Sequence, residues 1–314
     1  MVNNQQYHIP VLAPEATEAL ITRADGTYVD ATLGGGGYSE RILTMLAPAG
    51  RLIGFDTDTN AIDFASRRLA AYSERFTIVR ENFGDLKQGL DSISVAHIDG
   101  IVYDLGVSGN QFDTTSIGLS YRHESELDMR LDSRLTRSAK DIIAEDDEAE
   151  LATIFWKYGE EPTSRRIAYR ICRRRAQAPI TTTTELAAII GEGIREDKRN
   201  AVLSRIFQAL RIAVNDELGM LRRSLEQALE VLNPGGRIVV VSYHSLEDRI
   251  VKEFFNTEAR PKAEPGSAAF LRQTVDLSKA RLKLITNKPV IPSEAEIAEN
   301  VRARSAKMRV SEKL

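Results

Sequence analysis

Residues 27–43 have the types and spacing best suited to bind a cofactor. A run of apolar and β-branched residues ends at Asp30, four glycines follow at positions 34 to 37, and a helix-forming sequence begins near Tyr38. Glycine lets the backbone approach a ligand closely, and the free N–H groups that begin a helix favour a carboxylate or a phosphate. The pattern predicts a strand, a ligand-binding turn and a helix, with a simple flexible turn as the alternative.

Asp56 makes a nucleoside cofactor the preferred interpretation of this turn. It ends the next apolar run, where a carboxylate can accept hydrogen bonds from both ribose hydroxyls of an adenosine. Dinucleotide enzymes share that acid, but Ser39 stands where the third glycine or alanine of GxGxxG belongs, which disfavours a pyrophosphate. Asp30 before Gly34 and Gly36 resembles the first motif of Rossmann-like methyltransferases and suits the α-ammonium group of S-adenosylmethionine.

Phe83, Asp104 and His244 follow or end later apolar runs and are the next candidates for the site. Phe83 offers a ring that can cover an adenine, or it belongs to the core. Asp104 is expected at the carboxyl edge of the sheet, where a charged group is costly unless it has a partner. His244 is a candidate for proton transfer because the pKa of an unperturbed histidine is about 6.5; a capping or buried histidine is the alternative.

Short apolar runs alternate with helix-forming segments and predict an α/β fold with a parallel sheet. The predicted strands cover residues 27–32, 51–56, 75–80, 97–106 and 237–245. Strand signals stop in a charged, helix-forming stretch, which predicts an inserted all-α domain. The domain prediction assigns residues 1–111 and 213–314 to the sheet domain and residues 112–212 to the helical insertion.

The carboxyl-terminal third adds one long helix and two strands to this prediction. Apolar residues recur every three or four positions over residues 203–232, which predicts one amphipathic helix. Asn215 and Asp216 interrupt its apolar face, either to reach a cleft or as an exposed polar pair. Apolar runs at 282–286 and 307–310 are predicted edge strands.

Composition limits the partners and the compartment. The net charge is −3, so affinity for nucleic acid must come from local patches. Six arginines between positions 165 and 175 predict a phosphate-binding helix face, or a solvated face paired with acids such as Glu160 and Glu161. The chain has one cysteine, Cys172, and its four histidines lack ligand spacing, so we expect no metal site. It has no leader and no long apolar run, so we expect a cytoplasmic protein without a membrane segment.

A set of motifs along nearly the whole chain resembles the bacterial ribosomal RNA small subunit methyltransferase H family. These motifs are HIPVLAPEA (8–16), VDATLGGGGYS (29–39), NFGDL (82–86), DLGVSGNQFD (104–113), LDMRLD (127–132), YGEEPTSRRIA (158–168), ITTTTELA (180–187), FQALRIAVNDEL (207–218), SYHSLEDRIVK (242–252) and VRARSAKMRV (301–310). The resemblance implies a Rossmann-like class I methyltransferase sheet with an inserted helical domain. It also implies methylation of the exocyclic N4 of a cytidine in the decoding region of 16S rRNA, as free RNA or within the small ribosomal subunit.

The resemblance also implies the cofactor contacts, carried over by position. They are Gly36, Gly37, Tyr38, Asp56, Phe83, Asp104 and Gln111. At the turn, Gly35 and Tyr38 replace an arginine and a histidine that the family usually has, so the carry-over at Tyr38 does not extend to its side chain.

Methyl transfer requires alignment rather than a metal, because the sulfonium methyl group is already activated. The lone pair of cytosine N4 is delocalised into the ring, so an acceptor for the amino protons would favour the transition state. Asp104 is the first candidate for this acceptor, unless it only holds the cofactor, and His244 is the second. An NAD-linked oxidoreductase and a non-catalytic RNA-binding protein are the alternative functions, and a homodimer is compatible with the sequence.

Overall fold

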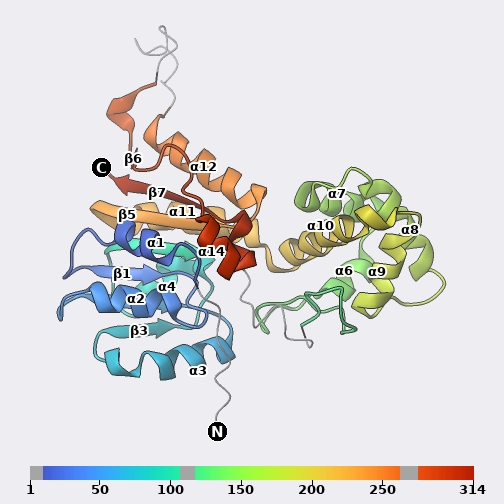
Figure 1. Ribbon diagram of the computed structural model, residues 1–314, viewed down its shortest axis with the longest axis horizontal. Helices are drawn as coiled ribbons and strands as arrows, with labels where there is room; N and C mark the ends of the chain where they lie inside the picture. Colours follow the sequence, from blue (N-terminus) through green and yellow to red (C-terminus); the bar gives the residue numbers. More distant parts are fainter. Residues whose placement is uncertain (1–9, 107–116, 262–274) are drawn as a thin grey trace. The chain divides into compact units, whose positions relative to one another are not determined.

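The computed structural model describes residues 10–106, 117–261 and 275–314, and the chain divides into two compact units (Figure 1). We call residues 1–106 and 218–314 the sheet unit and residues 107–217 the helical unit. No helix in the described ranges combines the length and the apolar character that a bilayer span needs.

The sheet unit is built on seven strands in the order β3-β2-β1-β4-β5-β7-β6. Their bounds are β1 (Thr27–Asp30), β2 (Arg51–Phe55), β3 (Phe76–Val79), β4 (Ile98–Asp104), β5 (Leu232–Ser242), β6 (Leu282–Leu284) and β7 (Lys307–Lys313). Neighbours among β1 to β5 pair in parallel, whereas β7 pairs antiparallel with β5 and β6. The predicted α/β class and its five parallel strands are confirmed.

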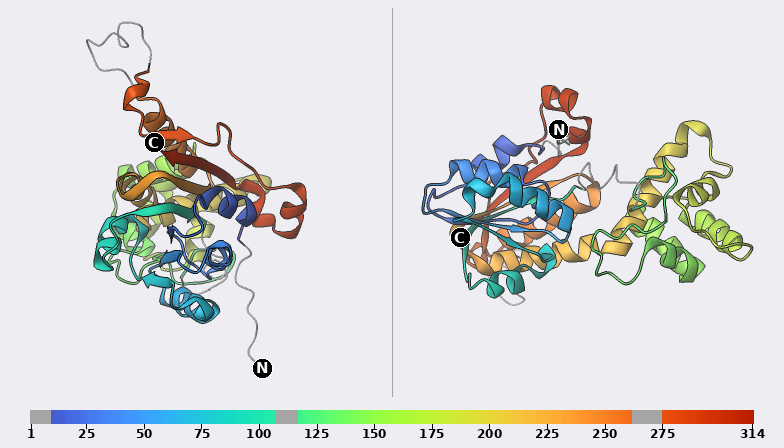
Figure 2. Two further views of the ribbon diagram at one scale, coloured as in Figure 1. Left: turned by 90° about the vertical axis from the view of Figure 1, so that its left-hand side faces the viewer. Right: turned by 90° about the horizontal axis from the view of Figure 1, so that it is seen from below.

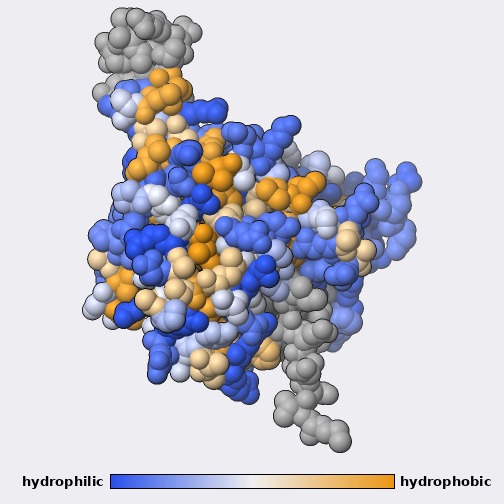
Figure 3. Space-filling view, turned by 60° about the vertical axis from the view of Figure 1, so that its left-hand side comes forward, coloured by the Kyte–Doolittle hydropathy of each residue, from blue (hydrophilic) through white to orange (hydrophobic). Residues whose placement is uncertain are grey.

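Helices flank both faces of this sheet (Figures 1 and 2). They are α1 (Ala13–Leu20), α2 (Gly37–Met45), α3 (Thr59–Arg68), α4 (Leu86–Ser92), α11 (Glu217–Val231), α12 (Ser245–Ala259) and α14 (Glu294–Glu299). Fully buried Tyr28, Phe55 and Tyr103 are the largest side chains of the core between the sheet and the helices. On the face shown in Figure 3, small groups of hydrophobic residues are interspersed with hydrophilic ones, as is usual for folded proteins.

The expectation that residues 307–310 form an edge strand is wrong. They begin β7, which lies between β5 and β6, so the edge belongs to β6, where the prediction for residues 282–286 is confirmed. In the structure the side chain of Arg309 is nearly buried, and its guanidinium is neutralised by Asp248, with Nε 2.6 Å from Oδ1.

The expectation of one long helix over residues 203–232 is also wrong. Asp216 adopts a left-handed backbone with φ of 48° and separates α10 (Glu196–Asn215) from α11. A double hydrogen bond from Arg211 to Glu217 spans the break, with N–O distances of 2.7 and 2.8 Å. The apolar periodicity continues through the break, which is why the sequence pattern did not reveal it.

In its described residues the helical unit consists of helices and one isolated bridge between Glu126 and Thr182. The helices are α6 (Ala139–Glu145), α7 (Glu148–Gly159), α8 (Ser164–Arg175), α9 (Thr183–Gly191) and α10. Capping boxes at Ser138, Asp147 and Thr182 begin α6, α7 and α9, because each side chain accepts an otherwise unpaired backbone N–H. The unit has its own core, in which Phe155 and Ile206 are completely buried.

Candidate active site

The glycine turn after β1 has the backbone geometry that glycine favours. Gly34 has φ of 47° and Gly36 has φ of 76°, both in the left-handed region. A Cβ atom at Gly36 would lie 3.2 Å from Leu69 Cδ1, and one at Gly37 would lie 3.0 Å from Pro10 Cγ. A Cβ atom at Gly34 would meet only the carbonyl oxygen of Thr32, at 3.8 Å. Two of the glycines therefore serve packing, and the open side of the turn is at Gly34.

Asp30 and Asp56 hold this turn in shape. The carboxylate of Asp30 is buried and accepts hydrogen bonds from the Ser39 hydroxyl at 2.7 Å and the Thr32 N–H at 3.2 Å. The carboxylate of Asp56 accepts the N–H groups of Gly34 at 2.8 Å and Asp58 at 2.9 Å. Burial raises the pKa of Asp30 to about 6 and also raises the pKa of Asp56. Ser39, which disfavoured a pyrophosphate, thus has a structural role.

Asp104 ends β4 and is held by side chains that follow the two neighbouring strands. Its N–H donates to Thr32 Oγ1 at 2.7 Å, and its Oδ1 accepts the hydroxyl of Tyr243, also at 2.7 Å. The Tyr243 ring requires glycine at position 106, because a Cβ atom there would lie 2.8 Å from ring atom Cε2. Burial raises the pKa of Asp104 to about 7, and the negative charges of Asp30 and Glu247 add to the effect. Sequence reasoning missed Tyr243, although its place directly after β5 was a usable signal.

The three acids form a cluster that contains no cation from the described part of the chain. Asp56 raises the pKa of Asp30, and Asp30 raises that of Asp104, so the carboxylates act on one another. No lysine or arginine in the described ranges bonds to any of the three. A ligand with positive groups would relieve this repulsion, and the α-ammonium and sulfonium groups of S-adenosylmethionine supply them. The three carboxylates therefore suit the binding of S-adenosylmethionine.

Phe83 is partly exposed at the sheet edge, whereas the side chain of Tyr38 is buried. Phe83 begins a short helix, η2 (Phe83–Asp85), after β3; it is half-buried and meets the ring of Tyr103 edge-on, with centroids 5.9 Å apart. The exposed part of this ring remains available to a ligand. Tyr38 is buried and its hydroxyl donates to the carbonyl of Val11, so its side chain belongs to the core. Gln111, the last predicted contact, falls outside the described residues.

His244 caps α12. Its Nδ1 accepts the N–H of Glu247 at 3.4 Å, while the Glu247 carboxylate accepts the backbone N–H groups of Tyr243 and His244. The other ring nitrogen, Nε2, is buried 3.0 Å from Glu247 Oε1 but makes no well-aligned hydrogen bond. The capping alternative describes this arrangement, and the role of His244 in proton transfer stays a prediction.

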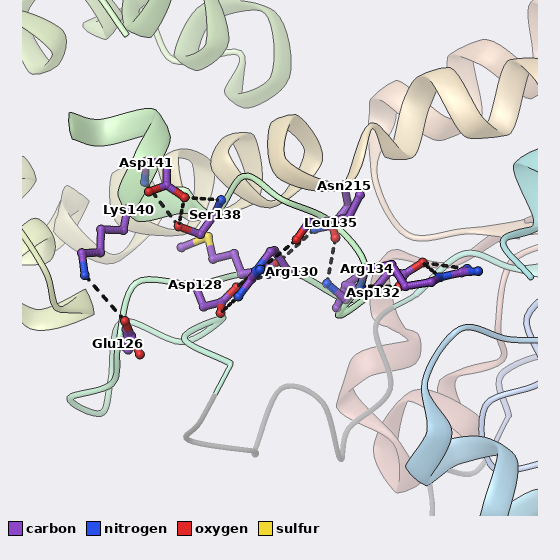
Figure 4. Close-up of polar contacts among 12 residues, drawn as sticks. Glu126, Asp128, Arg130, Asp132, Arg134, Leu135, Ser138, Lys140, Asp141 and Asn215 are labelled. Atoms are coloured by element: carbon purple, nitrogen blue, oxygen red, sulfur yellow. Dashed lines mark hydrogen bonds and ion pairs between the residues drawn. The ribbon is translucent and has the colours of Figure 1, made fainter. Parts of the chain in front are cut away.

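Asn215 is neither an exposed residue nor part of the sheet edge. Within the helical unit it fixes the backbone of residues 129–131, which belong to the LDMRLD motif of residues 127–132 (Figure 4). Its Oδ1 accepts the N–H of Leu131, and its Nδ2 donates to the carbonyl of Met129, each at 2.8 Å. Met129 has φ of 65°, a strained value for a residue with a side chain. Asn215 is therefore structural, and it keeps this segment folded against the end of α10.

A family model and a curated relative each match nearly the whole chain. A family model described as the MraW methylase family matches residues 5–314. The protein named ribosomal RNA small subunit methyltransferase H of Brevibacillus brevis is 47% identical over 311 residues, which cover 98% of each chain. Among solved structures, a putative rRNA-methylase from Clostridium thermocellum has 13% identity and a TM-score of 0.41, with 96% of this chain and 95% of that chain covered. TrmN from Thermus thermophilus has 12% identity and a TM-score of 0.42, with 97% and 49% covered.

Proposed function

We propose that this chain, which belongs to the MraW methylase family, methylates the exocyclic N4 of a cytidine in the decoding region of small-subunit ribosomal RNA, with S-adenosylmethionine as the methyl donor. Membership makes the chain a methyltransferase, and the name of its Brevibacillus brevis relative supports the ribosomal substrate. The structural observation that carries the proposal is the cluster of Asp30, Asp56 and Asp104 without a cation. The ribosomal substrate also implies a cytoplasmic location.

The residues of the turn and the neighbouring strand ends would hold the donor. Asp56 would accept the ribose hydroxyls, and the exposed part of the Phe83 ring would cover the adenine. The backbone at Gly36, Gly37 and Tyr38 and the side chain of Gln111 complete the proposed contacts. When bound, S-adenosylmethionine supplies an electrophilic methyl group, so the protein has only to align the nucleophile with it.

Asp104 is the proposed acceptor for the cytosine amino group. Tyr243 holds Oδ1, while Oδ2 accepts no hydrogen bond from the described residues. That oxygen can accept an amino proton of the cytosine and draw electron density toward N4 as the new bond forms. Its pKa of about 7 suits a group that must be ionised before the reaction and accept a proton after it. His244 is the second candidate, since its buried Nε2 lacks a well-aligned hydrogen bond.

The helical unit is proposed to recognise the RNA. A cytidine in folded RNA must leave its stack to reach a methyl donor, so a second binding surface is needed to hold the surrounding strand. The arginines of α8 supply local positive charge in a chain whose net charge is −3.

The test uses labelled S-adenosylmethionine and small ribosomal subunits from cells that lack the gene. We expect label in a single cytidine, identified as N4-methylcytidine by nucleoside mass spectrometry. Asp104→Ala and Asp56→Ala should abolish it, whereas Asp63→Ala, which removes an exposed acid on α3, should not. An unlabelled RNA digest, or tighter binding of NAD than of S-adenosylmethionine in calorimetry, would contradict the proposal.

A further inference from the structure

The arginines of α8 have no acidic partners among the residues that the structure describes. All six lie on this helix, and none forms an ion pair with a carboxylate in the described ranges: Arg165, Arg166, Arg170, Arg173, Arg174 and Arg175. The alternative of pairing with Glu161 fails, because its buried carboxylate binds Arg205 and Thr163 instead. So much unbalanced positive charge on one short helix indicates an anionic partner.

Helix geometry separates these arginines by role. One face of α8 is buried through Ser164, Ile167, Ala168 and Ile171. The opposite face is exposed and carries Arg165, Arg166, Tyr169 and Arg173, which we call the α8 face. Arg175 instead donates from Nη1 to the carbonyl of Ile143 at 2.6 Å, so it holds the helix to the unit.

Two of the guanidinium groups approach the same backbone turn. A Cβ atom built at Gly193 would lie 3.4 Å from Nη2 of Arg166 and 3.7 Å from Nη2 of Arg170. Arg170 also donates to the carbonyl of Ile190 at 3.4 Å, which fixes its position at the end of α9. Two like charges held near one turn repel each other, and a phosphate between them would remove that repulsion.

Tyr169, on the α8 face, and Trp156, on the neighbouring helix α7, are exposed aromatic side chains. Tyr169 is 48% exposed, and the guanidinium of Arg173 lies over its ring, 5.7 Å from the centroid. Helix α7, which packs against α8, exposes 61% of Trp156, the single tryptophan of the chain. Large aromatic side chains are seldom left this exposed without a use, and their rings stack well on unpaired bases.

We propose that the α8 face, with Arg170 beside it, binds an unpaired segment of RNA, its guanidinium groups contacting phosphates and Tyr169 stacking on a base. This rests on the proposed function, since the segment would belong to the RNA that carries the target cytidine. An acidic peptide would satisfy the arginines but would leave the exposed rings without a role. RNA, which combines phosphates with flat bases, satisfies both.

The test measures binding of a short fluorescein-labelled RNA hairpin with an unpaired loop, by anisotropy at several salt concentrations. Arg166→Gln with Arg173→Gln should weaken binding about 10-fold and lower the salt dependence by roughly 1.5 ions. Tyr169→Leu should weaken it by a similar factor with the salt dependence unchanged. The matched control is Arg23→Gln with Arg281→Gln, which removes the same charge from exposed arginines paired with Asp25 and Glu258.

The outcomes separate this inference from the proposed function. Calorimetry with S-adenosylmethionine and circular dichroism should show each variant folded. Equal losses in the control pair and the α8 pair would overturn the inference, because net charge alone would then explain binding. The inference would also be overturned if the α8 variants kept their affinity for the RNA hairpin but lost affinity for small subunits. That result would favour a protein partner. If the wild type binds the hairpin through the α8 face but methylates no cytidine, the inference stands and the proposed function falls.

Discussion

The sheet unit and the helical unit carry opposite charge imbalances. In the described part of the chain, Asp30, Asp56 and Asp104 lie together without a cation, and the arginines of α8 lie together without a carboxylate. Asp30 is buried and the other two acids are half-buried, so desolvation and mutual repulsion raise their pKa values and weaken the fold, whereas most of the arginines stay in water. A net charge of −3 hides both features. Charge must therefore be compared region by region, and each imbalance indicates a ligand of the opposite sign.

The largest effect is expected from Asp104→Asn, which keeps an acceptor for Tyr243 and removes the charge. We expect methyl transfer to fall at least about 100-fold. Because the raised pKa of about 7 means that the folded state binds a proton more tightly than the unfolded state, the wild type loses stability as pH rises from about 4 to 7. At pH 8 the free energy of unfolding of the variant should therefore exceed that of the wild type by on the order of 1–3 kcal/mol. Below pH 4 the two free energies should be equal.

Urea unfolding at pH 4 and pH 8 checks this prediction. A variant less stable than the wild type at pH 8 would show that the acid cluster stabilises the fold, and the contrast between the two units would be lost.

Asp56 tests whether the acid cluster binds the donor. Asp56→Asn removes the charge and keeps an oxygen that can accept the N–H of Gly34. We expect the dissociation constant for S-adenosylmethionine, measured by calorimetry, to rise about 10- to 100-fold, because an amide accepts hydrogen bonds from the ribose hydroxyls less well than a carboxylate does. Asp63→Ala is the control and should bind normally. Unchanged affinity in Asp56→Asn would remove Asp56 from the donor site.

Tyr243→Phe should change the pH dependence of the reaction. The hydroxyl lowers the pKa of Asp104, while Asp30 and Glu247 raise it, so its loss should move the rise of kcat/KM with pH to higher pH. At pH 7 the rate should fall roughly 2- to 5-fold and recover at pH 9. Tyr72→Phe, on the same unit, should keep the wild-type profile. A uniform loss at every pH would make Tyr243 merely structural.

The smallest effect is expected from Arg175→Gln. This arginine bonds to the carbonyl of Ile143, so its loss should lower the free energy of unfolding of the helical unit by about 0.5–1 kcal/mol. Its effect on hairpin affinity should be smaller than that of any of the three arginines on the α8 face. An effect on RNA binding as large as that of Arg166→Gln would extend the face to the whole helix.

The parallel strands could be predicted because each is a short apolar run bounded by turn residues. Two features of the fold could not be predicted from the sequence. Asp216 adopts its left-handed backbone inside an unbroken apolar pattern, and the charge of Arg309 is neutralised by a residue far away in sequence. The apolar periodicity indicates which face of a helix or strand is buried. It does not indicate where a helix ends, or where a distant partner allows a charged side chain to be buried.

Of the site, the sequence predicted the turn and the acids, because strand ends in a parallel sheet lie at one edge. It did not predict which groups those acids bind. The bond from Tyr243 to Asp104 joins residues after two neighbouring strands, and the packing of Tyr243 on Gly106 depends on the same pairing. The donor contacts and the role of His244 stay predictions.

The pairing of β4 with β5 has a consequence for the order of folding. These strands are neighbours in the sheet, although all of the helical unit separates them in sequence. Closing so long a loop costs conformational entropy, whereas β1 to β4 lie in one continuous stretch. In pulse-labelled hydrogen exchange we therefore expect amides of β1 and β2 to become protected before those of β5 and β7. Early assembly of the helical unit around its own core would shorten the effective loop and speed the later step.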